Sequence, residues 1–301
     1  MSLKIVGIGE VLWDLLPSGR QLGGAPANFT FHASALGAET QLISRVGKDD
    51  LGRETLDRLS KLGVPTECVE VDEKLPTGTV GVTVTADGQP QYQIHENVAW
   101  DAIRGDSAGR SGVAVADAVC FGSLAQRSEP SRTTIQSLVA AALASTLRIF
   151  DINLRQHYYS RDVIEKSLAL ANVLKVNDAE LPRLAQMFGL SGGERTQIQQ
   201  LAERNGLRAV ACTRGGNGSL LFAEGRWSDH PGVPTTVVDT VGAGDSFTAA
   251  LTLGLLAGWD LDRINDHANR VAAFVCSCAG ATPELPAPLR HAFTPAPTLS
   301  L

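Results

Sequence analysis

The sequence predicts an α/β fold built around a mostly parallel sheet in a single large domain. Short apolar runs alternate with segments of helical period over most of the 301 residues, as in successive βα units. Hydrophobic residues make up 44% of the chain and charged residues 19%, so a sizeable core can form and intrinsic disorder is excluded. One stretch, from Glu67 to Ile94, has period 2 instead and predicts a small β insertion over about residues 67–100.

Apolar runs and helical periodicity define the elements in order. The predicted strands are Ile5–Gly9, Gln41–Val46, Val115–Gly122, Arg148–Asp151, Val173–Asn177 and Ala209–Thr213. The predicted helices are Ala25–Leu36, Asp50–Leu62, Ser131–Ala144, Val163–Ala171, Ala179–Phe188, Glu194–Asn205, Ala243–Ala257 and Leu261–Ala279. Gly258 and Gly280 end the last two, because glycine adopts positive φ at little cost. The proline-rich segment from Thr282 onward is expected to form an extended surface tail.

The β insertion has the pattern of a hairpin. Strand-like runs at Val80–Thr85 and Gln91–Ile94 flank Ala86–Gln89, which contains an Asp-Gly pair, a strong turn signal. We expect this hairpin to leave the main sheet and to form a flap or small second sheet. Such an element would serve as a lid, as a dimer contact, or as both. The alternative is an antiparallel extension of the main sheet.

Charge and cysteine content narrow the possible partners. The formal charge is −6 and the isoelectric point is about 5.5, with no Lys/Arg cluster, which argues against nucleic acid or an anionic membrane as the main partner. No apolar run reaches the roughly 18–20 residues of a membrane span, and the first residues do not resemble a secretory signal. The five cysteines have no C-x-x-C spacing. We therefore expect a cytoplasmic protein with reduced cysteines.

The strongest local motif is Asp239-Thr-Val-Gly-Ala-Gly-Asp245, which runs directly into an apolar helix. Backbone N–H groups at such a helix start, together with the helix dipole, form a site for phosphate or developing negative charge. Asp245 lies in the first turn of the helix. It is either a helix cap or a general base beside an anion hole, and both interpretations are open at this point.

A second motif, Gly23-Gly24-Ala25-Pro26-Ala27-Asn28, precedes another apolar helix. Paired glycines allow a small ligand to approach the backbone closely, and proline suits a first helical turn. Asn28, one turn into the helix, could direct its amide toward the same ligand. A simple turn with a structural glycine pair is the equally admissible alternative.

Two common nucleotide-binding signatures are absent from the sequence. Gly7-x-Gly9 follows a strand, but Leu12 stands where the third glycine of a dinucleotide fingerprint belongs, and Glu10 would face the pyrophosphate. No G-x-x-x-x-G-K-[ST] occurs, so the chain has no P-loop.

The motifs together resemble the ribokinase-like, or phosphofructokinase B, family of carbohydrate kinases. Gly23–Gly52 and Asp239–Leu256 are similar to the two family signatures, and the Gly-Gly-Ala-Pro-Ala-Asn form is most similar to the fructokinases. The resemblance extends in order over about residues 3–282. It implies a ribokinase-like three-layer α/β/α domain over residues 1–301, with a β lid built mainly from about 67–100. It also implies ATP-dependent phosphorylation of a sugar, with fructose converted to fructose 6-phosphate as the favoured reaction.

The resemblance implies roles for residues on the acceptor side. Asp245 would be the general base, and the backbone N–H groups of Gly242, Ala243 and Gly244 would form the anion hole. The sugar would be bound by Asp14, Gly24, Asn28 and Gln126, and Arg155 would meet either sugar or phosphate. Gln126 stands where relatives often have glutamate, so ribose, 2-keto-3-deoxygluconate and nucleosides are alternative acceptors.

On the nucleotide side, the resemblance implies that ATP lies along Asn177, Thr213, Gly215 and Gly218, with Asn269 near the adenine. Asn177 and Glu180 would organise Mg²⁺, or would simply cap a helix. K⁺ would bind partly through Asp239, and the chain would form a homodimer through the lid. A non-catalytic sugar sensor is the alternative from another class, but it should have lost the base or the anion hole, which are both present.

Overall fold

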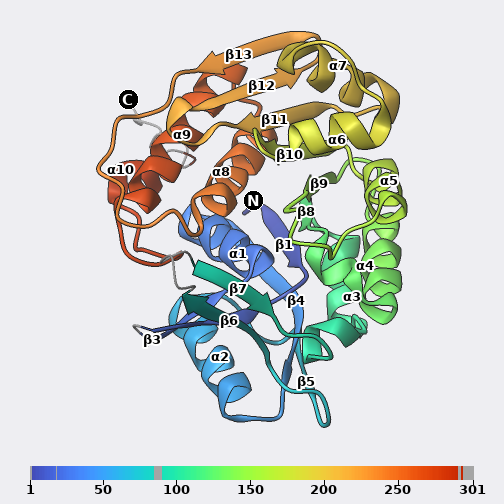
Figure 1. Cartoon of the computed structure of the whole chain (residues 1–301), viewed down its shortest axis with the longest axis vertical. Coiled ribbons are helices and arrows are strands. Elements are labelled where there is room, and N and C mark those ends of the chain that lie inside the picture. Colours follow the sequence, from blue (N-terminus) through green and yellow to red (C-terminus); the bar gives the residue numbers. More distant parts are fainter. Residues whose placement is uncertain (1, 18, 85–89, 291–292, 294–301) are drawn as a thin grey trace, which may run out of the picture.

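A computed structural model describes residues 2–17, 19–84, 90–290 and 293 (Figure 1). The strands are β1 Lys4–Ile8, β2 Leu12–Leu16, β3 Gly19–Gly23, β4 Glu39–Gly47, β5 Val69–Asp72, β6 Gly78–Val84, β7 Pro90–Ile94, β8 Ala118–Phe121, β9 Leu147–Asp151, β10 Val173–Asn177, β11 Ala209–Thr213, β12 Ser219–Ala223 and β13 Arg226–His230. The helices are α1 Ala25–Ala35, α2 Asp50–Lys61, α3 Ser107–Ala114, α4 Glu129–Ala141, α5 Arg161–Leu170, α6 Leu181–Phe188, α7 Glu194–Asn205, α8 Ala243–Leu256, α9 Leu261–Cys276 and α10 Ala287–Arg290, with 3₁₀ turns η1 Ala99–Ala102, η2 Leu124–Arg127 and η3 Gly215–Asn217. No helix in these ranges has both the length and the apolar character that crossing a membrane requires.

The main sheet has nine strands in the order β13-β12-β11-β10-β9-β8-β1-β4-β5. Pairing is parallel from β11 to β5, because a helix-containing connection returns the chain to the same edge, and antiparallel for β12 and β13. All six predicted strands and all eight predicted helices are present, with ends within three residues of those expected. The sequence interpretation had not assigned β2, β3, β5, β12, β13 and α3.

Helices cover both faces of this sheet and confirm the three-layer fold. Successive strand residues point to opposite faces, so Ile5 packs with Phe29 of α1 and Phe247 of α8, whereas Val6 belongs to the core that includes Ile135 of α4. Helices α1, α8 and α9 therefore cover one face, and α4 to α7 cover the other (Figure 1).

A separate four-stranded sheet has the order β3-β2-β6-β7. The predicted hairpin is confirmed by the antiparallel register of β6 and β7, from Val80 opposite Ile94 to Val84 opposite Pro90, and its turn at 86–89 lies outside the described residues. It does not extend the main sheet. Residues 67–100 supply β6 and β7 of this sheet, whereas β2 and β3, which the sequence analysis did not assign, come from residues 12–23, and β5 joins β4 in the main sheet. Leu12–Leu16 and Gly19–Gly23 do not alternate apolar and polar residues, so no period of 2 marks them as strands.

The described residues after Gly280, which are 281–290 and 293, pack against the body, contrary to the extended surface tail that we expected; the rest of the predicted tail, 291–292 and 294–301, lies outside the described residues. Leu285 is buried, and Phe293 stacks on Trp259 with ring centroids 4.4 Å apart. The one-turn helix α10 lies between them. The apolar residues between the prolines explain this difference, because their burial against α9 is more favourable than exposure.

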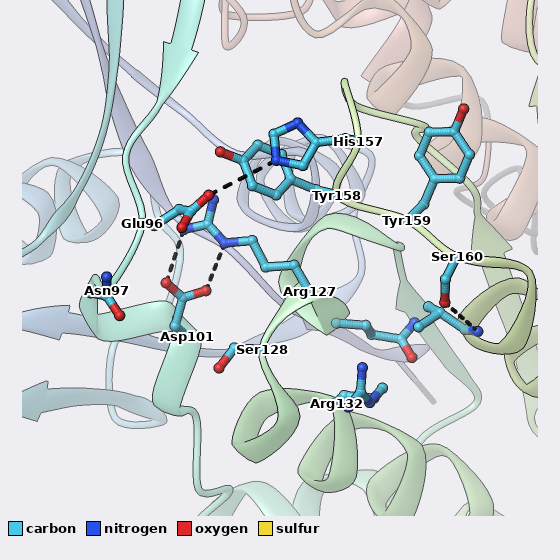
Figure 2. A pocket seen from close by; sticks show the side chains of 12 residues that line it. Glu96, Asn97, Asp101, Arg127, Ser128, Arg132, His157, Tyr158, Tyr159 and Ser160 are labelled. Atoms are coloured by element: carbon cyan, nitrogen blue, oxygen red, sulfur yellow. Dashed lines mark hydrogen bonds and ion pairs between the residues drawn. The ribbon is translucent and has the colours of Figure 1, made fainter.

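Arg127, at the end of η2, joins the separate sheet to the main body (Figure 2). Its guanidinium binds both carboxylate oxygens of Asp101, at 2.8 and 2.9 Å, and donates to the carbonyl of His95 at 2.6 Å. The same group lies over the rings of Trp100 and Tyr158, with its carbon 3.9 and 4.8 Å from their centroids. One buried cation therefore fixes the segment that follows β7.

Candidate active site

The two glycine-rich motifs meet in the folded chain. Asn28, in the first turn of α1, donates from Nδ2 to Oδ2 of Asp245, in the first turn of α8, at 2.8 Å. These residues are 217 positions apart, and both side chains are buried. The hydrogen bond brings the carboxylate of one motif and the amide of the other into one site, where α1 and α8 lie side by side (Figure 1).

The start of α8 has the properties of an anion hole. Gly242 has φ +79, and a Cβ there would lie 2.5 Å from the carbonyl oxygen of Ala281, so only glycine fits. Within the described residues, the N–H groups of Gly242 and Gly244 have no hydrogen-bond partner. The third predicted donor, Ala243, makes only a long bond of 3.4 Å to Thr240. These N–H groups lie at the positive end of the helix dipole.

Asp245 has the ionisation behaviour of a usable base. Burial, followed by the negative charge of Asp151, raises the pKa of its carboxyl to about 6, while Asn28, Lys175 and Arg155 oppose the rise. The carboxylate accepts from Asn28 and caps no backbone N–H group of α8. At pH 7 it is therefore mostly ionised, with a pKa close enough to neutrality for proton transfer.

Asp14 and Gly24 lie at the same end of the site. A Cβ on Gly24, which has φ +111, would lie 2.5 Å from the carbonyl oxygen of Glu10. A Cβ on Gly23 would lie 2.8 Å from Oδ2 of Asp14, its near neighbour across β2 and β3, so the glycine pair leaves this carboxylate room. Burial raises the pKa of Asp14, and the positive charge of Arg155 opposes this rise.

Arg155 is exposed, and its charge acts on three carboxyl groups. Burial raises the pKa of Asp14, Asp245 and Glu10, and the positive charge of Arg155 opposes each rise. Its guanidinium donates to the side chain of Asn153 at 3.3 Å. Arg155 is thus an exposed cation whose charge acts on this region, and its contact with sugar or phosphate stays a prediction.

Two buried charged residues of this region were missed by the sequence interpretation. Glu10 follows β1; burial raises its pKa to about 7, and its Oε2 has no partner among the described residues. Lys175 is buried within β10. A carboxylate directly after a buried strand, and a lysine inside one, were the available signals, because charged residues are rarely buried without a partner or a role.

The predicted nucleotide residues gather at the carboxyl ends of β10 and β11. Asn177 and Thr213 are register partners there, and η3 follows directly. Gly218 has φ +78, and a Cβ on it would lie 2.0 Å from the carbonyl oxygen of His230, so this turn requires glycine. Gly215 also has positive φ, at +54, but open space around it.

Asn269 lies behind this turn rather than at its surface. Its Nδ2 donates to Oγ of Ser219 at 2.7 Å and to Oδ1 of Asn265 at 3.0 Å, inside the contact between α9 and β12. Its amide N–H groups therefore have partners within the protein, and its place near the adenine stays a prediction.

Asn177 and Glu180 form a reciprocal capping arrangement. The Asn177 side chain accepts from the N–H of Glu180 at 2.9 Å, and Glu180 accepts from the N–H groups of Asn177 and Leu154, both at 2.9 Å. Each carboxylate oxygen retains a lone pair, and Mg²⁺ commonly keeps several waters and binds mainly through substrate phosphates. The pair therefore fits a water-mediated magnesium site, although no cluster of three acidic, His or Cys side chains occurs in the described ranges.

Asp239 fastens the loop before α8. Its Oδ1 accepts from the N–H of Val241 and its Oδ2 from that of Gly280, both at 3.0 Å. The carboxylate thus ties the motif to the chain after α9, and it retains lone pairs for a cation.

Gln126, a predicted sugar ligand, has both ends of its amide engaged within the protein. It is fully buried, with Nε2 donating to the carbonyl of Gly122 and to Ser167 Oγ at 2.8 and 2.9 Å, while Oε1 accepts from Gln136 at 3.0 Å. It borders a pocket of about 450 Å³ beside Asp101 and Arg127 (Figure 2), whose lining does not include Asp245. Its amide serves the packing of α4 and α5, which a sequence does not reveal.

The chain resembles known carbohydrate kinases over most of its length. The sequence model of the pfkB family carbohydrate kinases matches residues 19–288. An uncharacterized sugar kinase of Pyrococcus horikoshii is 32% identical over 296 residues (92% of this chain, 91% of the relative), and its crystal structure with ATP superposes with a TM-score of 0.78 over 92% and 94% of the two chains. A Klebsiella pneumoniae fructokinase is 32% identical over 269 residues (85% and 86%). Aminoimidazole riboside kinase of Salmonella enterica is 25% identical with a TM-score of 0.78 (96% and 99%).

Proposed function

Because this chain belongs to the pfkB family of carbohydrate kinases, we propose that it transfers the γ-phosphate of ATP to a hydroxyl of fructose, forming fructose 6-phosphate. The hydrogen bond between Asn28 and Asp245, beside the partner-free N–H groups of α8, is the observation that carries the proposal. The Klebsiella relative named fructokinase supports the choice of acceptor, and the ATP complex of the Pyrococcus relative supports the donor.

In this reaction the acceptor oxygen attacks the γ-phosphorus, and the bond from that phosphorus to the oxygen of ADP breaks. Asp245 takes the proton of the attacking hydroxyl. The N–H groups of Gly242 and Gly244 stabilise the negative charge on the transferred phosphoryl group. Since the base and the donors belong to one helix turn, the protein contributes positioning and fixed dipoles.

Sugar recognition follows from a mixture of acceptors and donors. Asp14 accepts from sugar hydroxyls, Asn28 both donates and accepts, and Gly24 lets the ring approach the backbone. Arg155 supplies a donor at the open end of the site. On the nucleotide side, ATP would lie along Thr213, Gly215 and Gly218. Asn177 and Glu180 would hold Mg²⁺ through water, and the bound ion would neutralise phosphate charge.

The remaining parts of the proposal concern ions, assembly and location. K⁺ would bind beside Asp239, next to the anion hole. The separate sheet would close over the sugar as a lid and pair with a second copy, since β3 and β7 are edge strands. A cytoplasmic location suits an enzyme that consumes ATP.

The proposal is tested by measuring ADP release from Mg-ATP with a panel of unphosphorylated sugars, polyols and nucleosides, with and without K⁺. The panel includes fructose, ribose, 2-keto-3-deoxygluconate and aminoimidazole riboside. We expect the highest kcat/KM with fructose. A higher value with another acceptor would overturn the fructose assignment alone, and no turnover with any acceptor would contradict the kinase proposal and favour a sugar sensor.

Replacing Gly242 with alanine should lower kcat by about 100-fold, because the new Cβ displaces the N–H groups that the anion hole needs. The measurement is steady-state kinetics with the preferred acceptor. Gly225→Ala is a matched control, since Gly225 lies in the turn between β12 and β13 with a similar φ of +75 but no atom within 4 Å of its Cβ position. Equal losses in the two variants would mean that backbone strain, and not the anion hole, explains the effect.

A further inference from the structure

A buried ion pair lies beneath the first turn of α8. Lys175 Nζ is 3.2 Å from Asp151 Oδ1, and the two side chains are 4% and 6% exposed. Asp151 Oδ2 in turn accepts from the Thr248 hydroxyl of α8 at 2.7 Å. Adjacent strands β9 and β10 thereby bind the start of the helix that carries Asp245.

The ammonium group of Lys175 is directed at the anion hole. A Cβ on Gly244 would lie only 3.0 Å from Nζ, so the cation sits directly against the backbone of the predicted donor. Asp151 is its only hydrogen-bond partner among the described residues, although an ammonium has three donors. Stability of the fold alone does not explain a buried cation at this place, because a buried ion pair seldom stabilises a protein more than apolar residues of similar size.

The titratable groups around Asp245 come from several elements. Glu10 follows β1, Cys120 lies on β8, Asp151 and Lys175 lie on β9 and β10, and Arg155 follows β9. Lys175 and Arg155 are the cations of this set. Arg155 is exposed and its field is screened by solvent, whereas Lys175 is buried and acts through a medium of low dielectric constant.

We propose that Lys175 is a positioning residue of the phosphoryl-transfer site, whose buried positive charge supports the Asp245 carboxylate and the backbone donors of Gly242 and Gly244. This inference rests on the proposed kinase function. As the phosphoryl group arrives, Lys175 offsets its negative charge from behind the helix turn, while Asp151 and Thr248 hold the ammonium in place. A lysine that only stabilises the fold would leave the pH-independent kcat of a folded variant unchanged.

The first test needs no turnover. Protein labelled with ¹³C at aspartate carboxyl carbons is titrated by NMR, with the Asp245 signal assigned through Asp245→Asn. We expect a midpoint near pH 6 in the native protein and a midpoint about one pH unit higher in Lys175→Met, because removal of a nearby cation favours the protonated acid. Lys175→Arg should restore the native midpoint, and Lys166→Met, at an exposed lysine of α5, should leave it unchanged.

The second test measures kinetics on the same variants. Lys175→Met should lower the pH-independent kcat by at least about 10-fold, with the sugar KM within about threefold, and its acid limb should move to higher pH. If Lys175→Met does not fold, the double variant Lys175→Met/Asp151→Asn removes both charges, and its plateau kcat should still be low.

The outcomes separate the two proposals. An unchanged Asp245 midpoint in folded Lys175→Met, or a native kcat in the double variant, would overturn the role of Lys175. A shifted midpoint in a protein that phosphorylates no acceptor would support the charge effect of Lys175 on Asp245 while contradicting the kinase proposal.

Discussion

Asp245→Asn should lower kcat by about a thousandfold while the affinity for the sugar changes little. General bases commonly contribute 10²- to 10⁴-fold, and asparagine cannot accept the hydroxyl proton. The substitution keeps the shape of the side chain and an oxygen that can accept from Asn28, so the packing of α1 and α8 should persist. The loss should therefore appear in kcat, as expected for an interaction made in the transition state.

The measurement is ADP release at saturating sugar, together with calorimetric titration of sugar into the variant. Asp162→Asn is a suitable control, because Asp162 is an exposed acid on α5 that pairs with Lys166. Retention of a tenth of the native turnover by Asp245→Asn would rule out the general-base role. Loss of sugar binding in parallel with kcat would instead indicate that Asp245 mainly holds the acceptor.

Arg127→Met should destabilise the protein by about 3–5 kcal/mol in free energy of unfolding. The substitution leaves the carboxylate of Asp101, which is 10% exposed, without its charge partner, and breaking a buried pair from one side has this cost. It also removes the donor to His95 and the cation stacked between Trp100 and Tyr158. The effect should be read from urea unfolding followed by circular dichroism.

An exposed ion pair provides the comparison for Arg127. Arg195 and Asp229 have side chains 52% and 45% exposed, so Arg195→Met should cost no more than about 1 kcal/mol. The double variant Arg127→Met/Asp101→Leu should recover part of the lost stability, because two apolar side chains need no charge partner. Similar costs for Arg127→Met and Arg195→Met would contradict a central role of Arg127 in joining the separate sheet to the body.

Local pattern was sufficient for the elements of the main sheet. Runs such as Val173–Asn177 and Ala209–Thr213 are apolar over a whole strand, as buried parallel strands must be, and the predicted bounds agree with the structure. The glycines of the two motifs could also be recognised from the sequence. Gly24 and Gly242 have positive φ, and neighbouring backbone approaches each of them too closely for a Cβ atom. The strands β2 and β3 were missed, since β2 is held by pairing with β6 and β3 by pairing with β2.

The sequence by itself therefore determined the fold class, the family and the identity of the two motifs, because these depend on periodicity and on the chemistry of consecutive residues. Only the tertiary structure decided that Asn28 meets Asp245, that Lys175 lies against Gly244, and that the amide of Gln126 is turned into the packing of α4 and α5. The physical reason is that burial, hydrogen-bond partners and pKa arise from contacts between distant segments. A carboxylate such as Asp245 acquires its pKa from burial and then from neighbours such as Asp151 on β9 and Lys175 on β10, and nothing within its own helix turn specifies them.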